Sequence, residues 1–235
     1  MPPAEMSCPV VEGVRFSTAN HVLEGELAYP EDRTIPLGAV VVAGSHPLLG
    51  GNMHNNVVRG LGDGLAERGW ATLRFNYRGV GRSEGPRVDV AHHLAEFWRT
   101  SHVAGEMDLW QDVQGAVAFM RSVVDPSLPL VLIGYSFGCA LLPAVGRAAS
   151  PAALITVAPP LGKHNYSDFM DSQCPILAIV SEDDFTLEQP RLKIWFDALP
   201  EPKRLAQKAS DNHFFRGHEP WIVETASAFL EEHLP

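Results

Sequence analysis

The 235-residue sequence contains only three cysteines, Cys8, Cys139 and Cys174. So small and odd a set does not form a disulfide framework, and without a Cys-x-x-Cys pair there is no zinc knuckle. A reduced compartment follows as the simplest expectation. Residues 1–12 show no apolar run behind a basic start, so we expect no secretory signal and a cytoplasmic location.

Clusters of positive charge and long apolar runs are also missing. The chain has 18 Lys and Arg against 28 Asp and Glu, a net charge of −10, and no basic run exceeds two residues. Nucleic acid and anionic lipid both reward clustered Lys and Arg, so neither is expected as a partner. No stretch approaches the roughly 20 apolar residues of a membrane helix. The oligomeric state is not readable from these features.

Internal repeats, low-complexity segments and Pro/Gly-rich linkers are absent as well. The composition, 46% hydrophobic and 20% charged, is that of an ordinary soluble globular protein. We therefore expect residues 1–235 to form a single domain.

What the chain does contain is an alternation of short apolar runs and helix-length segments. Residues 10–17 and 23–29 flank a turn-like segment and predict an N-terminal antiparallel hairpin. Apolar runs typical of strands buried on both faces follow at residues 39–43, 71–75, 130–133, 153–157 and 176–180. Helices are predicted over residues 56–68, 107–123, 137–149, 188–199 and 219–234. This order predicts an α/β fold with a mainly parallel central sheet and helices on both faces.

The most informative segment is a Gly-x-Ser-x-Gly motif between a predicted strand and a predicted helix. Gly134, Ser136 and Gly138 form it. A nucleophilic serine at the end of a strand stands on a tight, strained turn, and small residues on either side let the backbone pass. A plain strand-to-helix turn with a buried serine is the alternative, and the strand and helix around the motif disfavour it.

A serine nucleophile needs a base, and the base needs an orienting acid. His213 lies in a loop before the last predicted helix and is the best base candidate. Asp183 and Asp184 both follow the strand predicted at 176–180; we prefer Asp184 as the acid and keep Asp183 as the alternative. Along the chain the candidates follow one another in the order serine, acid, histidine.

With these residues in place, the chain resembles the α/β-hydrolase superfamily over nearly its whole length. It is most similar to small lidless bacterial serine hydrolases of the dienelactone-hydrolase and esterase type. The segment His46-Pro47-Leu48 resembles the His-Gly oxyanion loop, with Pro47 where glycine is commoner, and residues 211–215 resemble the histidine loop. Residues 74–83 resemble the Arg-Gly-x-Gly-x-Ser turn, in which we expect Arg78 to form a structural ion pair.

The resemblance implies a catalytic triad of Ser136, Asp184 and His213. It also implies oxyanion donors from the backbone N–H groups of Phe137 and Leu48. A helical lid is not expected, because only residues 158–174 separate two consecutive strands.

The longer segment 84–105 is instead expected to cover the site as an insertion. Candidate substrate-binding residues are His46, Tyr135, Phe97 and Trp98. The alternative for segment 84–105 is an amphipathic helix packed on the surface.

These features predict a serine hydrolase that cleaves an ester-type bond of a small molecule, with a carboxylesterase as first choice. Thioesterase, lactonase, amidase, C–C-cleaving and acyl-transfer activities use the same residues, and a catalytically silent ligand-binding module is an alternative of another class. No cofactor is expected. No metal is expected either. Scaffolding of the oxyanion loop is favoured over a polar or metal cluster for His46, Asn52, His54 and Asn55, and the group His92, His93, Glu96 and His102 shows no fixed ligand spacing.

Overall fold

A single sheet organises the computed structural model, which describes residues 8–31, 35–209 and 212–234. The strand order is β1-β2-β4-β3-β5-β6-β7-β8. β1 and β2 form the N-terminal hairpin, β2 pairs antiparallel with β4, and every pair from β4 to β8 is parallel. The strands are β1 (Pro9–Ser17), β2 (Val22–Pro30), β3 (Ala39–Ala43), β4 (Ala71–Phe75), β5 (Leu130–Tyr135), β6 (Ala153–Val157), β7 (Ile176–Ser181) and β8 (Lys203–Lys208).

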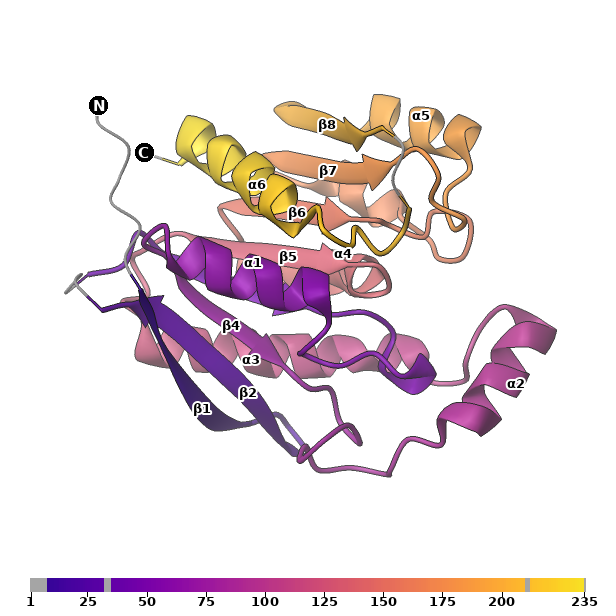
Figure 1. Cartoon of the computed structure of the whole chain (residues 1–235), viewed down its shortest axis with the longest axis horizontal. Helices are drawn as coiled ribbons and strands as arrows, with labels where there is room; N and C mark the ends of the chain where they lie inside the picture. Colours follow the sequence, from indigo (N-terminus) through magenta and orange to yellow (C-terminus); the bar gives the residue numbers. More distant parts are fainter. Residues whose placement is uncertain (1–7, 32–34, 210–211, 235) are drawn as a thin grey trace.

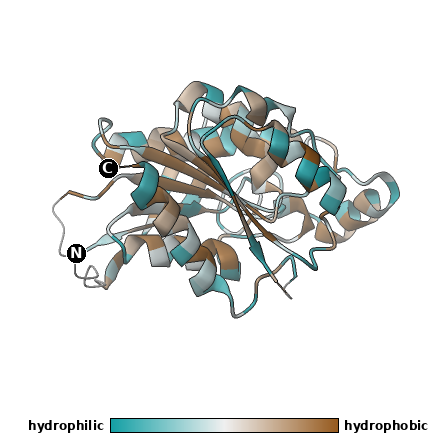
Figure 2. Cartoon of the chain, turned by 90° about the horizontal axis from the view of Figure 1, so that it is seen from above, coloured by the Kyte–Doolittle hydropathy of each residue, from teal (hydrophilic) through white to brown (hydrophobic). Residues whose placement is uncertain are grey.

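Helices cover both faces of the sheet, so that the apolar strands form a central layer (Figures 1 and 2). The α-helices are α1 (Asn56–Ala66), α2 (Val90–Thr100), α3 (Trp110–Val123), α4 (Gly138–Ala149), α5 (Gln189–Ala198) and α6 (Glu219–His233). Short 3₁₀ turns lie at η1 (Pro47–Leu49), η2 (Glu106–Leu109) and η3 (Ser167–Asp171). α1 and α6 pack together on one face, and α3 and α4 pack together on the other.

The two hydrophobic cores divide the residues of each central strand between them. In β5, Leu130 and Leu132 belong to the core under α3 and α4, whereas Val131 and Ile133 belong to the core under α1 and α6. Alternate side chains of a strand point to opposite faces, so a strand covered on both sides must be apolar throughout. This confirms the predicted fold, including its hairpin and its mainly parallel sheet.

Two elements were not predicted as such. β8 is an edge strand with four polar residues out of six, only partly buried, so it carries no apolar run to reveal it. α2 lies within the segment 84–105 and buries none of its residues fully. Figure 1 shows it projecting from the body next to η1. No helix in the described ranges has the length and apolar character needed to cross a membrane.

Candidate active site

Ser136 stands on a strained turn at the carboxyl end of the central strand β5. Its φ of 54° lies in the left-handed region, where a residue with a side chain is strained. Its N–H donates to the carbonyl of Val157 at the end of β6, 2.8 Å away. Ser136 as a residue remains partly exposed.

The glycines on either side of Ser136 are required by close backbone contacts. A Cβ on Gly138 would lie 2.1 Å from the carbonyl oxygen of Ala43, and one on Gly134 would lie 2.6 Å from the backbone of Cys139. Helix α4 therefore begins directly against the end of β3. The motif is local in sequence, but the need for Gly138 comes from a neighbouring strand.

The loop before α6 brings His213 to the serine. The Ser136 hydroxyl and His213 Nε2 are 2.9 Å apart, the distance of a hydrogen bond from serine to imidazole. His213 is buried, and the Tyr135 hydroxyl donates to its backbone carbonyl over 3.3 Å. Asp211, part of the histidine-loop motif, lies outside the described residues.

The acid that meets His213 in the structure is Asp184. His213 Nδ1 lies 2.9 Å from Oδ2 and 3.0 Å from Oδ1 of Asp184, which is buried, whereas Asp183 is exposed. Burial alone would raise the pKa of the Asp184 carboxyl, but hydrogen bonds from His213 and Thr186 outweigh it and hold the pKa below its ordinary value. Asp184 is therefore ionised at neutral pH and favours the Nδ1–H tautomer of the imidazole.

Thr186 is a site residue that the sequence interpretation missed. Both its N–H and its hydroxyl donate to Asp184 Oδ1, at 2.8 and 2.7 Å. These bonds fix the orientation of the carboxylate. A threonine two residues after an acid is a common turn pattern, and this was the signal available in the sequence.

The two expected oxyanion donors lie in the segments that follow β5 and β3. Phe137 is the residue between Ser136 and α4, and Leu48 is the middle residue of η1. Within the part of the chain that the structure describes, neither backbone amide has a hydrogen-bond partner among the turn and loop contacts. Both are thus free to donate to an incoming oxygen, and their role as oxyanion donors stays a prediction.

Tyr135 and His46, two residues expected to bind substrate, are buried beside the serine. Tyr135 is 1% exposed, and its bond to the His213 carbonyl fixes the histidine loop. His46 stacks on Phe137 with 4.3 Å between ring centroids and contacts Glu106, 2.9 Å away. A substrate contact of either residue stays a prediction.

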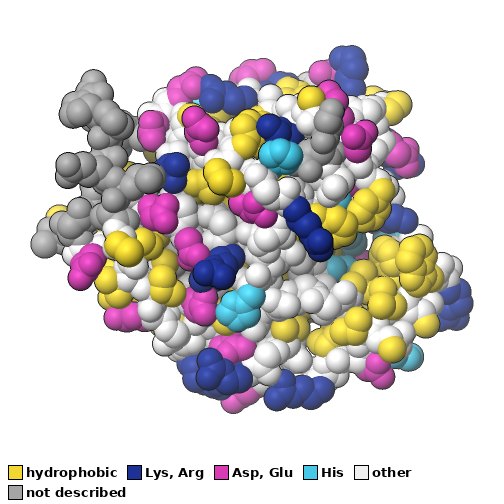
Figure 3. All heavy atoms as spheres, in the orientation of Figure 1, with side chains coloured by type: hydrophobic (Ala, Val, Ile, Leu, Met, Phe, Trp, Pro, Cys, Tyr) yellow, Lys and Arg dark blue, Asp and Glu magenta, His cyan; other side chains and the backbone are white. Residues whose placement is uncertain are grey.

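Phe97 and Trp98 lie on α2, beside η1. Trp98 is 80% exposed, and the Lys163 ammonium lies 5.6 Å from the centre of the Phe97 ring. Figure 3 shows hydrophobic side chains gathered over α2. Segment 84–105 therefore contains a surface helix with an apolar face, as in the alternative interpretation, and a substrate contact of Phe97 or Trp98 remains a prediction.

Arg78 forms the ion pair that we expected. Its guanidinium lies 2.6 Å from the buried carboxylate of Asp112 in α3. The contact fixes the turn after β4 against that helix.

A profile of the family described as serine aminopeptidase, S33, matches residues 39–212. This span includes both the β5 elbow and Asp184. The chain belongs to this family of α/β serine hydrolases. An uncharacterized protein of Rickettsia prowazekii (strain Madrid E) is 26% identical over 173 residues, which are 73% of this chain and 65% of the relative. The chain spans less than two thirds of the length of that curated relative.

Solved structures share the fold along almost the whole hydrolase. A lidless α/β serine hydrolase of Xanthomonas campestris has a TM-score of 0.79 and 23% identity, covering 96% of this chain and 95% of that one. An α/β serine hydrolase homologue of Coxiella burnetii has a TM-score of 0.76 and 24% identity, with 93% and 97% covered. A dienelactone hydrolase of Anabaena variabilis has a TM-score of 0.71 and 20% identity, with 97% and 100% covered. All three share the expected fold, and the Xanthomonas campestris structure is described as lidless.

Proposed function

We propose that this hydrolase cleaves an ester-type bond of a small molecule through an acyl-enzyme intermediate on Ser136. The observation that carries the proposal is the continuous chain of hydrogen-bond distances from Ser136 through His213 to Asp184. The base lies within 3.0 Å of both the nucleophile and the orienting acid, in the order that acyl transfer requires.

In the proposed reaction, His213 Nε2 takes the Ser136 proton as the hydroxyl attacks the substrate carbonyl carbon. The electron pair of the C=O bond moves to oxygen, and the Phe137 and Leu48 amides donate to that oxyanion. Collapse of the intermediate breaks the bond to the leaving alcohol, which takes its proton from His213. Water then repeats the sequence through the same base and releases the acid.

Exposed aromatic side chains beside His213 support a substrate with an apolar group. Phe185 is 74% exposed and its ring centre lies 5.2 Å from that of His213; Phe214 is 43% exposed and lies 5.5 Å away. Large apolar side chains left in solvent next to a reactive group are typical of a binding surface. Esters with a medium-length acyl chain or an aryl group fit this surface better than charged esters.

The test begins with a fluorophosphonate probe, which reacts with an activated serine. We expect the purified chain to be labelled at Ser136, with Ser136→Ala unlabelled. Ser122→Ala is the matched control, since this exposed serine lies near the end of α3 and should leave labelling unchanged. A wild-type chain that fails to react would overturn the proposal in favour of a silent binding module.

A substrate panel then separates the activities that the same residues permit. p-Nitrophenyl esters of increasing chain length, a thioester, a lactone and an aminoacyl anilide would be compared by kcat/KM. The proposal expects the highest values for the simple esters. Highest values for the anilide would favour an aminopeptidase instead, the activity for which the family is named.

A further inference from the structure

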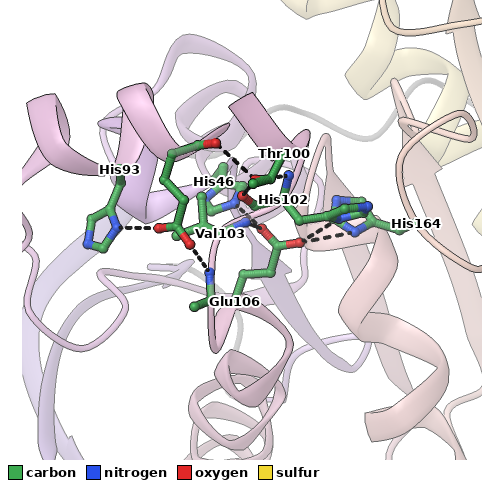
Figure 4. Close-up of polar contacts among 9 residues, drawn as sticks. His46, His93, Thr100, His102, Val103, Glu106 and His164 are labelled. Carbon is green, nitrogen blue, oxygen red and sulfur yellow. Dashed lines mark hydrogen bonds and ion pairs between the residues drawn. The ribbon is translucent and has the colours of Figure 1, made fainter. Parts of the chain in front are cut away.

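A buried carboxylate near the active site faces three imidazole rings (Figure 4). Glu106, at the start of η2, is only 4% exposed. Its Oε2 accepts hydrogen bonds from His46 Nε2 at 2.9 Å and from the N–H of Val103 at 2.8 Å. Its Oε1 faces Nδ1 of His102 at 3.2 Å and Nδ1 of His164 at 3.7 Å.

The 3.7 Å contact between Glu106 Oε1 and His164 Nδ1 is too long for a hydrogen bond. It does suit two ligands of one metal ion. A tetrahedral ion with bonds of about 2.0–2.1 Å separates its neighbouring ligand atoms by about 3.4 Å. The distances of 3.2 and 3.7 Å from Oε1 lie on either side of that value. The ligand atoms of His102, Glu106 and His164 all lie within 4.8 Å of one another, so a small inward movement would give each a bond to a shared ion.

The two carboxylate oxygens of Glu106 have different surroundings. Oε2 is held by His46 and by the Val103 amide, which orients the carboxylate. Hydrogen bonds of this kind fix a ligand and increase the affinity of metal sites. Oε1 is left facing the two imidazole nitrogens.

The members of the cluster differ in their exposure to solvent. The side chains of Glu106 and His164 are only 5% and 7% exposed, so a bound ion would be largely shielded from water. The His102 side chain is 56% exposed, which provides an entry path from solvent.

We propose that His102, Glu106 and His164 bind a divalent transition-metal ion, with His46 as the residue that positions the carboxylate. Two imidazoles and one carboxylate suit Zn²⁺ and its neighbours better than Mg²⁺ or Ca²⁺, which prefer oxygen ligands alone. The fourth position is available to water. The ion joins the segment after α2 to the loop after β6, next to Phe137, whose ring lies 5.4 Å from that of His164.

Calorimetric titration of the full chain with Zn²⁺, after treatment with a chelator, tests the site. We expect one equivalent to bind and the Tm to rise with Zn²⁺ concentration. Co²⁺ bound to the same ligands should give the visible absorption of a tetrahedral site. Absence of stoichiometric binding of either ion would overturn the proposal.

Variants locate the bound ion. His102→Ala changes a largely exposed side chain, so its fold should be preserved, and it should weaken Zn²⁺ binding by at least about tenfold; Glu106→Gln should do the same. The matched control is His93→Ala, which changes a second group of possible ligands, His92, His93 and Glu96, within α2. Loss of binding in His93→Ala with full binding in His102→Ala would refute the assignment. The readout is binding, so it is independent of whether the hydrolase cleaves esters.

Discussion

The contact between Gly138 and the end of β3 gives a quantitative prediction for Gly138→Ala. The new Cβ would lie 2.1 Å from the Ala43 carbonyl oxygen and 2.7 Å from that of Gly44. Because real Cβ atoms essentially never come within 3.0 Å of such atoms, α4 and the end of β3 must separate by about 0.9 Å or more. Both contacting atoms belong to backbone, so no side-chain rotation can relieve the clash.

This displacement acts on the proposed catalytic groups as well as on stability. The start of α4 carries Phe137, and the segment after β3 carries Leu48, so the two expected oxyanion donors move apart. A misplacement of about 1 Å can reduce catalysis about 100-fold, and overpacking a core costs about 1–3 kcal/mol. We expect kcat/KM for a p-nitrophenyl ester to fall by about two orders of magnitude and the Tm to fall by several degrees.

The matched control is Gly146→Ala in the same helix. Its nearest neighbours to a new Cβ are 3.8 Å away, and alanine is favoured over glycine in a helix interior by about 0.5–1 kcal/mol. This variant should keep its kcat/KM and gain slightly in Tm. If Gly138→Ala behaved like Gly146→Ala in both assays, the role assigned to the close contact would be refuted.

Four further predictions concern Asp184, Tyr135 and Trp98. In steady-state kinetics, Asp184→Asn should lower kcat by about 10⁴, whereas the kcat of Asp183→Asn should stay within about twofold of the wild-type value. Similar losses of kcat in both variants would contradict the assignment of Asp184 as the acid. Folding lowers the pKa of Asp184, so its charge contributes stability above pH about 4 and that contribution is lost as the pH falls through the lowered pKa. The Tm difference between the wild type and Asp184→Asn should therefore shrink on acidification, and a constant difference would oppose this reasoning. Tyr135→Phe removes one buried hydrogen bond to the His213 loop and should lower the free energy of unfolding in urea by about 1 kcal/mol. It should also reduce kcat more than it changes KM. An unchanged kcat would argue against a role of Tyr135 in positioning His213. Trp98→Ala should raise KM for long-chain esters and leave acetate esters unaffected, and equal kinetics across chain lengths would exclude a substrate contact.

The central strands and the elbow could be predicted from the sequence because their causes are local. A strand covered on both faces must be apolar throughout, as in residues 39–43, and the Gly-x-Ser-x-Gly motif specifies its own turn. The edge strand β8 gave no such signal, since its polar residues pair with β7 through the backbone. The choice between Asp183 and Asp184 depended on a shift of one residue in a loop, which no periodic pattern resolves.

The cluster around Glu106 could not be predicted from the sequence, because it is formed by contacts between segments that are distant along the chain. His102 and Glu106 are four residues apart, but His164 joins them from the loop after β6, and His46 from the loop after β3. No spacing rule covers such a set. Tyr135 directly precedes the nucleophile in the sequence, but only the structure shows that its ring is buried in the core under α1 and α6 and that its hydroxyl holds the histidine loop.

Phe137 connects the proposed catalytic serine with the cluster around Glu106. Its backbone follows Ser136, and its ring contacts both His46, which stacks on it at 4.3 Å, and His164, whose ring centre is 5.4 Å away. Glu106 holds His46, and His46 begins the η1 loop that carries Leu48. The relative positions of the two expected oxyanion donors therefore depend on a carboxylate that neither of them contacts. A buried charge is retained only where hydrogen bonds compensate for its lost hydration, and here those bonds come from the segments that border the serine. A change at Glu106 should consequently alter the reaction at Ser136 even though no reacting atom touches it.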